Sequence, residues 1–153
     1  MTNIKPKIAI SIGDLNGIGV GIALKCHEKI SKICRPIYCI NDVMLKKASD
    51  KLKIEIPKDF ELFETKGDFE IKEGTVSKKA GKYSYDSFMD AINLANKKKV
   101  NAICTLPINK ESWNKADIKY KGHTEVLRDY FGKNAIMMLG CKKMFVGLFT
   151  EHI

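Results

Sequence analysis

Residues 7–30, KIAISIGDLNGIGVGIALKCHEKI, contain the pattern that decides the fold class. The segment opens with a short apolar run at 7–13, which is typical of a buried strand. A glycine-rich turn follows, and apolar residues then recur at helical spacing over 17–30. The order strand, glycine turn and helix predicts the first unit of an α/β protein.

The same alternation continues along the rest of the chain. Residues 84–99 form the clearest amphipathic helix, with Phe88, Ile92 and Ala95 on one face. Strands that alternate with helices indicate an α/β sheet, and neither an internal repeat nor a low-complexity linker interrupts the pattern. Further strands are predicted at 35–42, 60–64, 100–106, 135–140 and 143–150, and further helices at 42–54, 107–116 and 124–131.

Length and composition are those of an ordinary globular protein. The chain has 153 residues, of which 44% are hydrophobic and 29% charged, so we expect one domain with a usable core. Its apolar runs are all far shorter than the roughly 20 residues of a membrane span. The first apolar run is also too short for a secretory signal. These features predict a cytosolic protein without a membrane segment.

The five cysteines fit the same compartment. Their number is odd and no CxxC pair occurs, so neither a disulfide framework nor a zinc knuckle is predicted. Cys39, Cys104 and Cys141 lie in or beside apolar runs, where buried free thiols are common. We therefore expect these three side chains to be buried.

The formal charge of +9 raises the question of nucleic-acid binding. Of the 27 basic residues only Arg35 and Arg128 are arginine, the side chain that reads phosphates and base edges best. The lysines are spread along the chain, and the one dense cluster, 97–99, follows a predicted helix, where cations suit the helix dipole. The pattern favours a lysine-rich solvated surface over a nucleic-acid-binding domain, and a small anionic substrate would also suit a basic protein.

The glycine turn has the position of a phosphate-binding loop but not its spacing. In the dinucleotide pattern G-x-G-x-x-G, Gly17 and Gly19 fill the first two glycine positions, and Ile22 occupies the third. No Lys-Ser or Lys-Thr pair follows the turn, as a P-loop requires. Asp42, near the end of the second strand, has the place of a ribose-binding acid, but aspartate is also common at helix starts. The turn is better explained by glycines that let strand and helix pack closely.

The segment TLPINKESWNKADIKYKGHTEVL, residues 105–127, gathers polar side chains after a predicted strand. Within it, His123 and Thr124 stand at a predicted helix start, where an imidazole, a hydroxyl and free backbone N–H groups would suit an anion such as phosphate. The alternative is ordinary capping of the helix by Thr124 beside an exposed His123. The residues by themselves leave both interpretations open.

Three blocks of sequence extend this hypothesis: GDLNGIG at 13–19, LPINK at 106–110 with KGHTE at 121–125, and GLFTEHI at 147–153. In these blocks, and in their order, the chain resembles the N-terminal half of the 4-hydroxythreonine-4-phosphate dehydrogenase family of pyridoxal phosphate biosynthesis. That family is about twice as long. Residues 1–153 are therefore expected to be its N-terminal portion, with the C-terminal half absent from this chain.

The resemblance implies a fold, a reaction and several site residues. The fold would be the N-terminal portion of an isocitrate/isopropylmalate-dehydrogenase-like, mixed-sheet α/β/α structure. The reaction would be NAD-dependent (or NADP-dependent) oxidation and decarboxylation of a phosphorylated substrate, in a homodimer with its active site between subunits. His123 and Thr124 match substrate-binding residues, and His152 matches the first of three histidines that bind a divalent metal, such as zinc, magnesium or cobalt. Lys110 and Asp14 are candidates for the general base by position only, and the residues that contact NAD are not identified.

The chain departs from the family pattern around the glycine turn. Residues 15–16 are Leu-Asn in place of Pro-Ala, residues 20–21 are Val-Gly in place of Pro and an acid, and Leu106 replaces a small residue. These departures bear on the substrate, and another four-carbon phosphorylated hydroxy acid remains an alternative. His27, in a lysine-rich helix without a second ligand at convincing spacing, is predicted to be a surface histidine.

Overall fold

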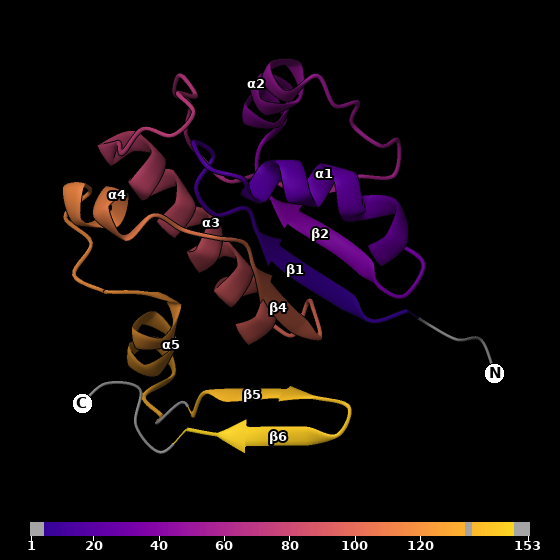
Figure 1. Ribbon diagram of the computed structural model, residues 1–153, viewed down its shortest axis with the longest axis vertical. Helices are drawn as coiled ribbons and strands as arrows, with labels where there is room; N and C mark the ends of the chain where they lie inside the picture. The colour runs from indigo at the N-terminus through magenta and orange to yellow at the C-terminus, as the bar shows by residue number, and fades with distance from the viewer. Residues whose placement is uncertain (1–4, 134–135, 149–153) are drawn as a thin grey trace. The chain divides into compact units, whose positions relative to one another are not determined.

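The computed structural model describes residues 5–133 and 136–148, and it divides the chain into two compact units. One unit covers residues 1–118 and the other residues 119–153. Each is described by itself (Figure 1). Within the described ranges no helix is both long enough and apolar enough to cross a bilayer.

The first unit is built on a four-stranded parallel sheet. Its strand order is β3-β2-β1-β4, so the first strand lies in the interior and the chain adds strands on both sides of it. All four strands lie within or close to the ranges that the apolar runs predict. They are β1 (Lys7–Ser11), β2 (Arg35–Cys39), β3 (Glu61–Phe63) and β4 (Ala102–Thr105).

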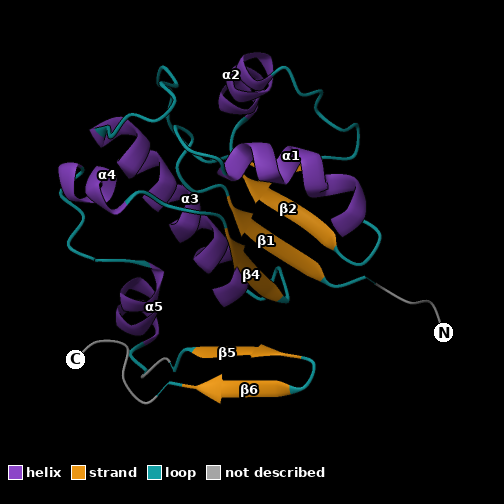
Figure 2. Cartoon of the chain, viewed as in Figure 1, coloured by secondary structure: helices purple, strands orange, loops and turns teal. Residues whose placement is uncertain are grey.

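Helices cover both faces of this sheet (Figure 2). Side chains alternate along β1, so Ile10 packs with the core of α1 and α2, whereas Ala9 packs with Ala91 of α3 on the other face. Burial on both faces explains why the interior strands β1 and β2 are apolar runs rather than alternating ones. The helices are α1 (Gly19–Ile30), α2 (Asp42–Leu52), α3 (Lys78–Asn96) and α4 (Lys110–Lys115).

Helix α3 begins six residues before the predicted start at 84. The Ser77 side chain accepts the N–H of Ala80 at 3.1 Å and so caps the helix. The apolar period does not extend into this first part because its buried face contacts α4 through Gly81 and Ser84, which are small. Trp113 of α4 is fully buried and donates its indole N–H to Ser84 Oγ at 2.7 Å.

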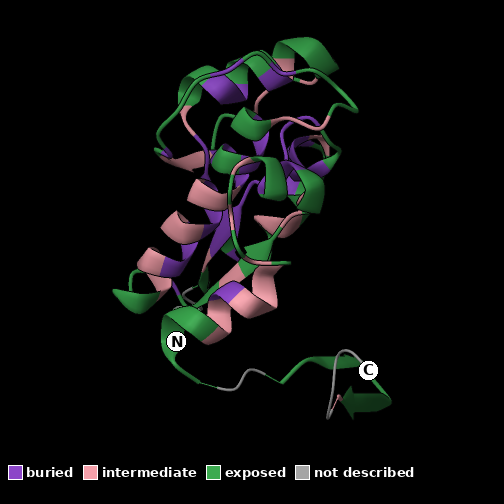
Figure 3. Ribbon diagram, turned by 90° about the vertical axis from the view of Figure 1, so that its left-hand side faces the viewer, coloured by how far each residue is buried: buried purple, intermediate pink, exposed green. Residues whose placement is uncertain are grey.

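The second unit contains one helix and one hairpin. Helix α5 (His123–Phe131) ends at Gly132, whose φ of 59° is the left-handed conformation that suits a helix C-terminus. Strands β5 (Met138–Cys141) and β6 (Met144–Gly147) pair antiparallel. The hairpin is exposed along both strands, in contrast to the interior strands β1 and β2 of the first unit (Figure 3).

The prediction that His27 is a surface residue is wrong. His27 is 1% exposed and lies on the buried face of α1. Its Nδ1 lies 3.0 Å from the Tyr38 hydroxyl, and its Nε2 lies 3.1 Å from Asp59 Oδ1. Tyr38 stacks on Phe60, with ring centroids 3.7 Å apart. Only Nδ1 of this buried imidazole has a hydrogen-bond partner, and Nε2 faces the Asp59 carboxylate without making a hydrogen bond.

The expected burial of the three cysteines is confirmed only for Cys39. This side chain lies in the sheet interior, and burial raises the pKa of its thiol to about 12. Cys104 lies on the edge strand β4, Cys141 lies in the exposed hairpin, and both are exposed. An apolar run therefore predicts a strand, but not whether that strand is covered.

Two glycines inside helices allow a matched test of this packing. A Cβ added at Gly81 would lie 1.9 Å from the Ser112 carbonyl oxygen, so Gly81→Ala forces α3 and α4 apart. We expect it to lower the free energy of unfolding by about 2 kcal/mol or more. At Gly21 the added Cβ meets only Leu52 at 3.5 Å, so Gly21→Ala should stabilise by up to about 1 kcal/mol through helix propensity. Urea denaturation of both variants measures the free energy of unfolding. Equal changes in the two variants would contradict the close approach of the α3 and α4 backbones at Gly81.

Candidate functional site

The sheet order places a switch point between β1 and β4. From β1 the chain moves outward to β2 and β3 on one side, and then returns to add β4 on the other. In open parallel sheets, ligands bind outside the carboxyl ends of the strands at such a reversal. The loops that leave β1 and β4 there are the glycine turn and the segment LPINK, which are two of the three family-like blocks.

Backbone contacts join these two loops directly. The N–H of Asp14 donates to the Pro107 carbonyl at 2.9 Å, and the N–H of Leu106 donates to the Ser11 carbonyl at 3.1 Å. Gly13 has φ +70°, and a Cβ at this position would lie 2.3 Å from the Pro107 oxygen. Only glycine therefore fits here, both for its conformation and for its space. The structure brings blocks 90 residues apart in sequence into contact.

A second glycine explains the start of α1. A Cβ at Gly19 would lie 2.9 Å from the Ile12 carbonyl oxygen, so the helix start packs tightly on the end of β1. The prediction that the turn's glycines permit close strand–helix packing is confirmed.

Asp42, considered as a ribose-binding acid, is the first residue of α2. Its carboxylate pairs with the Lys46 ammonium at 2.8 Å, while Asn41 caps that helix.

Asn16, one of the departures from the family pattern, anchors the turn to residues 72–75. Its side-chain N–H groups donate to the Thr75 carbonyl at 2.9 Å, and its Oδ1 accepts the N–H of Lys72 at 2.9 Å. Its own carbonyl accepts the N–H of Gly74 at 2.8 Å. Asn16 is 4% exposed, and both its amide nitrogen and its amide oxygen have hydrogen-bond partners. Sequence reasoning missed this role because the partners lie nearly 60 residues away.

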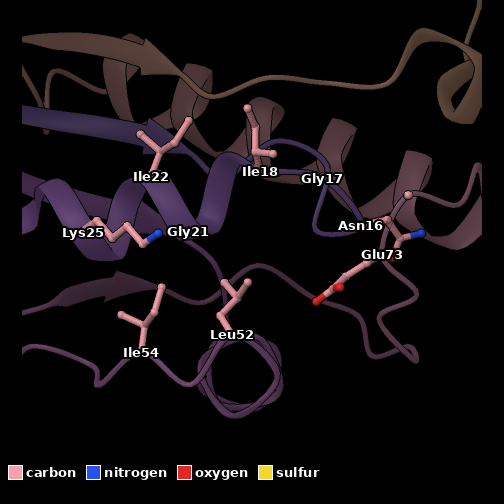
Figure 4. A pocket seen from close by; sticks show the side chains of 10 residues that line it. Asn16, Gly17, Ile18, Gly21, Ile22, Lys25, Leu52, Ile54 and Glu73 are labelled. Atoms are coloured by element: carbon pink, nitrogen blue, oxygen red, sulfur yellow. The ribbon is translucent and has the colours of Figure 1, made fainter.

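A groove of about 480 Å³ lies beside the turn. Figure 4 shows Ile22 of α1 on one side and Leu52 and Ile54 on the other. Two of its lining residues, Asn16 and Gly21, are positions where the chain departs from the family pattern. The other three departures lie elsewhere, because residues 15 and 20 are buried in the core and residue 106 packs against it.

The two candidates for the general base have contrasting surroundings. Asp14 is 5% exposed, and burial raises the pKa of its carboxyl, an effect that the hydrogen bond from the Asn16 N–H partly offsets. Lys110 is exposed and is the first residue of α4. The preceding residue, Asn109, caps this helix by accepting the N–H of Ser112 at 2.8 Å. Asp14 thus lies within the loop after β1, at its junction with Pro107, whereas Lys110 lies where the loop after β4 ends.

His123 and Thr124 are the first two residues of α5. The helix is preceded by Gly122, which provides no side-chain cap, and Thr124 lies inside the helix. The alternative in which Thr124 caps the helix is therefore wrong. His123 is half-buried, and burial lowers the pKa of its imidazole, which favours the neutral form. The N–H groups at the helix start suit an anion, to which a neutral imidazole can add one hydrogen bond but no positive charge.

The candidate metal ligand His152 lies outside the residues that the structure describes. Within residues 5–133 and 136–148, no three His, Cys, Asp or Glu side chains lie close enough together to hold a metal ion. The described residues therefore supply no metal centre of their own, and His152 keeps its role as a prediction.

These features define an open, parallel α/β protein whose candidate site lies at the carboxyl ends of β1 and β4. The chain belongs to the family described as pyridoxal phosphate biosynthetic protein PdxA, whose model matches residues 32–153.

Individual relatives agree with this membership. The chain is 57% identical, over 149 residues, to a 4-hydroxythreonine-4-phosphate dehydrogenase of Sulfurimonas denitrificans, covering 97% of this chain and 48% of the relative. A protein of the same name from Campylobacter fetus is 56% identical, with the same coverage of both chains. A crystal structure of the Burkholderia phymatum protein of that name matches with a TM-score of 0.85 and 29% identity, covering 99% of this chain and 51% of that one. The chain thus spans about half the length of these relatives.

Replacement of Asp14 by asparagine tests the cost of its burial. Because the raised pKa means that the fold disfavours the carboxylate, Asp14→Asn removes an unfavourable charge and keeps the acceptor for the Asn16 N–H. We expect the midpoint of urea denaturation at pH 7 to stay the same or rise. Asp14→Ala, which also removes the acceptor, should lower it. A lower midpoint for Asp14→Asn than for Asp14→Ala would contradict this assignment.

The lowered pKa of His123 predicts a pH dependence with a defined sign. The unfolded chain binds this proton as the pH falls through about 6.5, and the folded chain binds it only at lower pH. The histidine therefore reduces the free energy of unfolding as the pH falls below about 6.5. An NMR titration of the imidazole, assigned with His123→Gln, should give a midpoint below 6.5. A midpoint at or above 6.5 would show that the His123 imidazole is solvated, and would contradict its burial.

Proposed function

We propose that this chain is part of a metal- and NAD-dependent (or NADP-dependent) 4-hydroxythreonine-4-phosphate dehydrogenase. The reaction would oxidise and decarboxylate 4-(phosphooxy)-L-threonine to 3-amino-2-oxopropyl phosphate in pyridoxal 5'-phosphate biosynthesis. The observation that carries the proposal is the joining of the glycine turn to LPINK at the switch point of the sheet, in a chain 57% identical to a protein of that name.

Within this proposal, the start of α5 binds the substrate. His123 and Thr124 would contact the phosphorylated substrate, with the helix N–H groups and dipole favouring its negative charge. The neutral imidazole, favoured by burial, can donate one hydrogen bond without carrying a charge. Asp14 and Lys110 remain the two candidates for the general base.

The remaining parts of the proposal come from the resemblance. His152 would be one of the ligands of a divalent metal (zinc, magnesium or cobalt), which when bound would stabilise an alkoxide on the substrate and polarise the ketone that follows. We further propose an isocitrate/isopropylmalate-dehydrogenase-like fold for the complete protein. We also propose a homodimer with a shared active site and a cytosolic location, where the five free thiols stay reduced.

A related phosphorylated substrate is the second candidate. Asn16 and Gly21 replace the family's usual residues, and both line the groove beside the turn. Because these two changes lie beside the candidate site, they bear on the substrate more directly than the buried changes at residues 15 and 20 do. Other four-carbon phosphorylated hydroxy acids therefore belong in the same assay.

Nucleic-acid binding is not favoured. Many lysines meet acidic partners on the surface, which leaves less positive charge for a phosphate backbone. These pairs lie on several different elements rather than on one face. They include Lys32–Glu28, Lys46–Asp42, Lys47–Asp68, Lys78–Asp117, Lys82–Asp86 and Lys115–Glu111.

The activity assay is direct. The complete protein expressed from its natural gene should form NADH from NAD, phosphorylated hydroxythreonine and a divalent metal, and a chelator should abolish the signal. The 153-residue chain alone should be inactive, because two of the three metal ligands implied by the resemblance lie beyond it. Absence of NADH with this substrate and with related phosphorylated acids would refute the proposal. Turnover by the 153-residue chain would refute the claim of a divided site.

A further inference from the structure

Residues 119–121, which we call the strap, run into the start of α5 and are bound to the side of that same helix. The N–H of Lys121 donates to Glu125 Oε2 at 2.7 Å. The Tyr120 hydroxyl donates to the Asp129 carboxylate, and the Lys119 ammonium lies 3.3 Å from Asp129 Oδ2. Each of the three strap residues therefore has its own contact with α5.

The two acceptors on the helix share one face. Glu125 and Asp129 are four residues apart, so they stand one above the other, one helical turn apart. The hydrogen bond from Tyr120 and the charge of Lys119 hold the pKa of the Asp129 carboxyl below its usual range. The strap thus lies along this face and fixes the side from which the chain enters the helix.

The chain leaves the strap through Gly122, and this residue leaves the helix start open. Gly122 has extended backbone with φ 174°, and no side chain caps the first turn. Glu125 is in that turn, where a capping box would direct its carboxylate to the backbone N–H of the residue before the helix. Here the carboxylate is instead bound one residue earlier, by Lys121. The contact satisfies an acidic side chain that would otherwise compete with an anion for the N–H groups of the helix start.

We propose that Tyr120 and Asp129 are positioning residues for the substrate phosphate. By holding the strap on the Glu125 face they keep the first turn of α5 open, with His123 and Thr124 in a fixed orientation. This inference rests on the proposed function, because it requires that the helix start binds a phosphate. It assigns a role to residues outside the family-like block KGHTE, which the sequence pattern did not single out.

The test uses the complete protein with phosphorylated hydroxythreonine, NAD and the metal. Tyr120→Phe removes only the hydroxyl, and Asp129→Asn removes the charge that Tyr120 and Lys119 contact. Both should raise the KM for the phosphorylated substrate by about 3- to 10-fold, because small displacements of a binding group have large effects. The kcat and the KM for NAD should change less than 2-fold. Tyr130→Phe makes the same chemical change near the other end of α5 and is the matched control.

The possible outcomes distinguish failure of the proposed function from failure of the positioning role of Tyr120 and Asp129. If the wild-type protein is inactive with every phosphorylated acid tried, the proposed function fails and takes this inference with it. If the wild type is active and Tyr120→Phe and Asp129→Asn have wild-type KM values, the strap has no positioning role. If kcat and both KM values change together with a fall in Tm, the contacts are merely structural and the inference is wrong. A rise in the substrate KM alone, absent from Tyr130→Phe, supports it.

Discussion

The hydrogen bond from the Asp14 N–H to the Pro107 carbonyl, made possible by Gly13, is the contact on which the candidate site depends. It joins the loop after β1 to the loop after β4, across the point where the order of the sheet reverses. A side chain at position 13 would meet the Pro107 oxygen at 2.3 Å and would also be strained at φ +70°. The two loops can therefore stay together only while this residue is glycine.

Packing between α3 and α4 holds the loop after β4, and so supports its contact with the loop after β1. The loop after β4 leads into α4, which is held against α3 by the buried Trp113 and its hydrogen bond to Ser84. Gly81 allows the two helix backbones to approach, and Asn109 caps the short helix. On the opposite side, Asn16 binds the turn to residues 72–75. The loops are thus held by buried and partly buried hydrogen bonds, which are stronger where their partners are shielded from water.

Apolar runs, helical spacing and Pro107 predicted the order and type of the described elements, although β4 and the hairpin strands are exposed rather than buried on both faces. It failed where burial depends on partners distant in sequence. The start of α3 was missed because small residues, not large apolar ones, face α4. His27 was placed on the surface because its partners, Tyr38 and Asp59, cannot be inferred from its own helix. The glycine spacing argued against a dinucleotide-binding loop. The close approach of Gly13 to Pro107 could not be predicted from the sequence, because the two residues are far apart along the chain.

Gly13→Ala in the complete protein tests most directly whether the contact between the two loops assembles the site. Gly132→Ala is the control, because Gly132 also has a positive φ but a Cβ there would meet nothing within 4 Å. We expect Gly13→Ala to lower kcat/KM for the phosphorylated substrate by about 100-fold or more, since misplaced site residues have effects of that size. Gly132→Ala should retain activity. Equal kcat/KM values for the two variants would contradict the claim that this junction assembles the site.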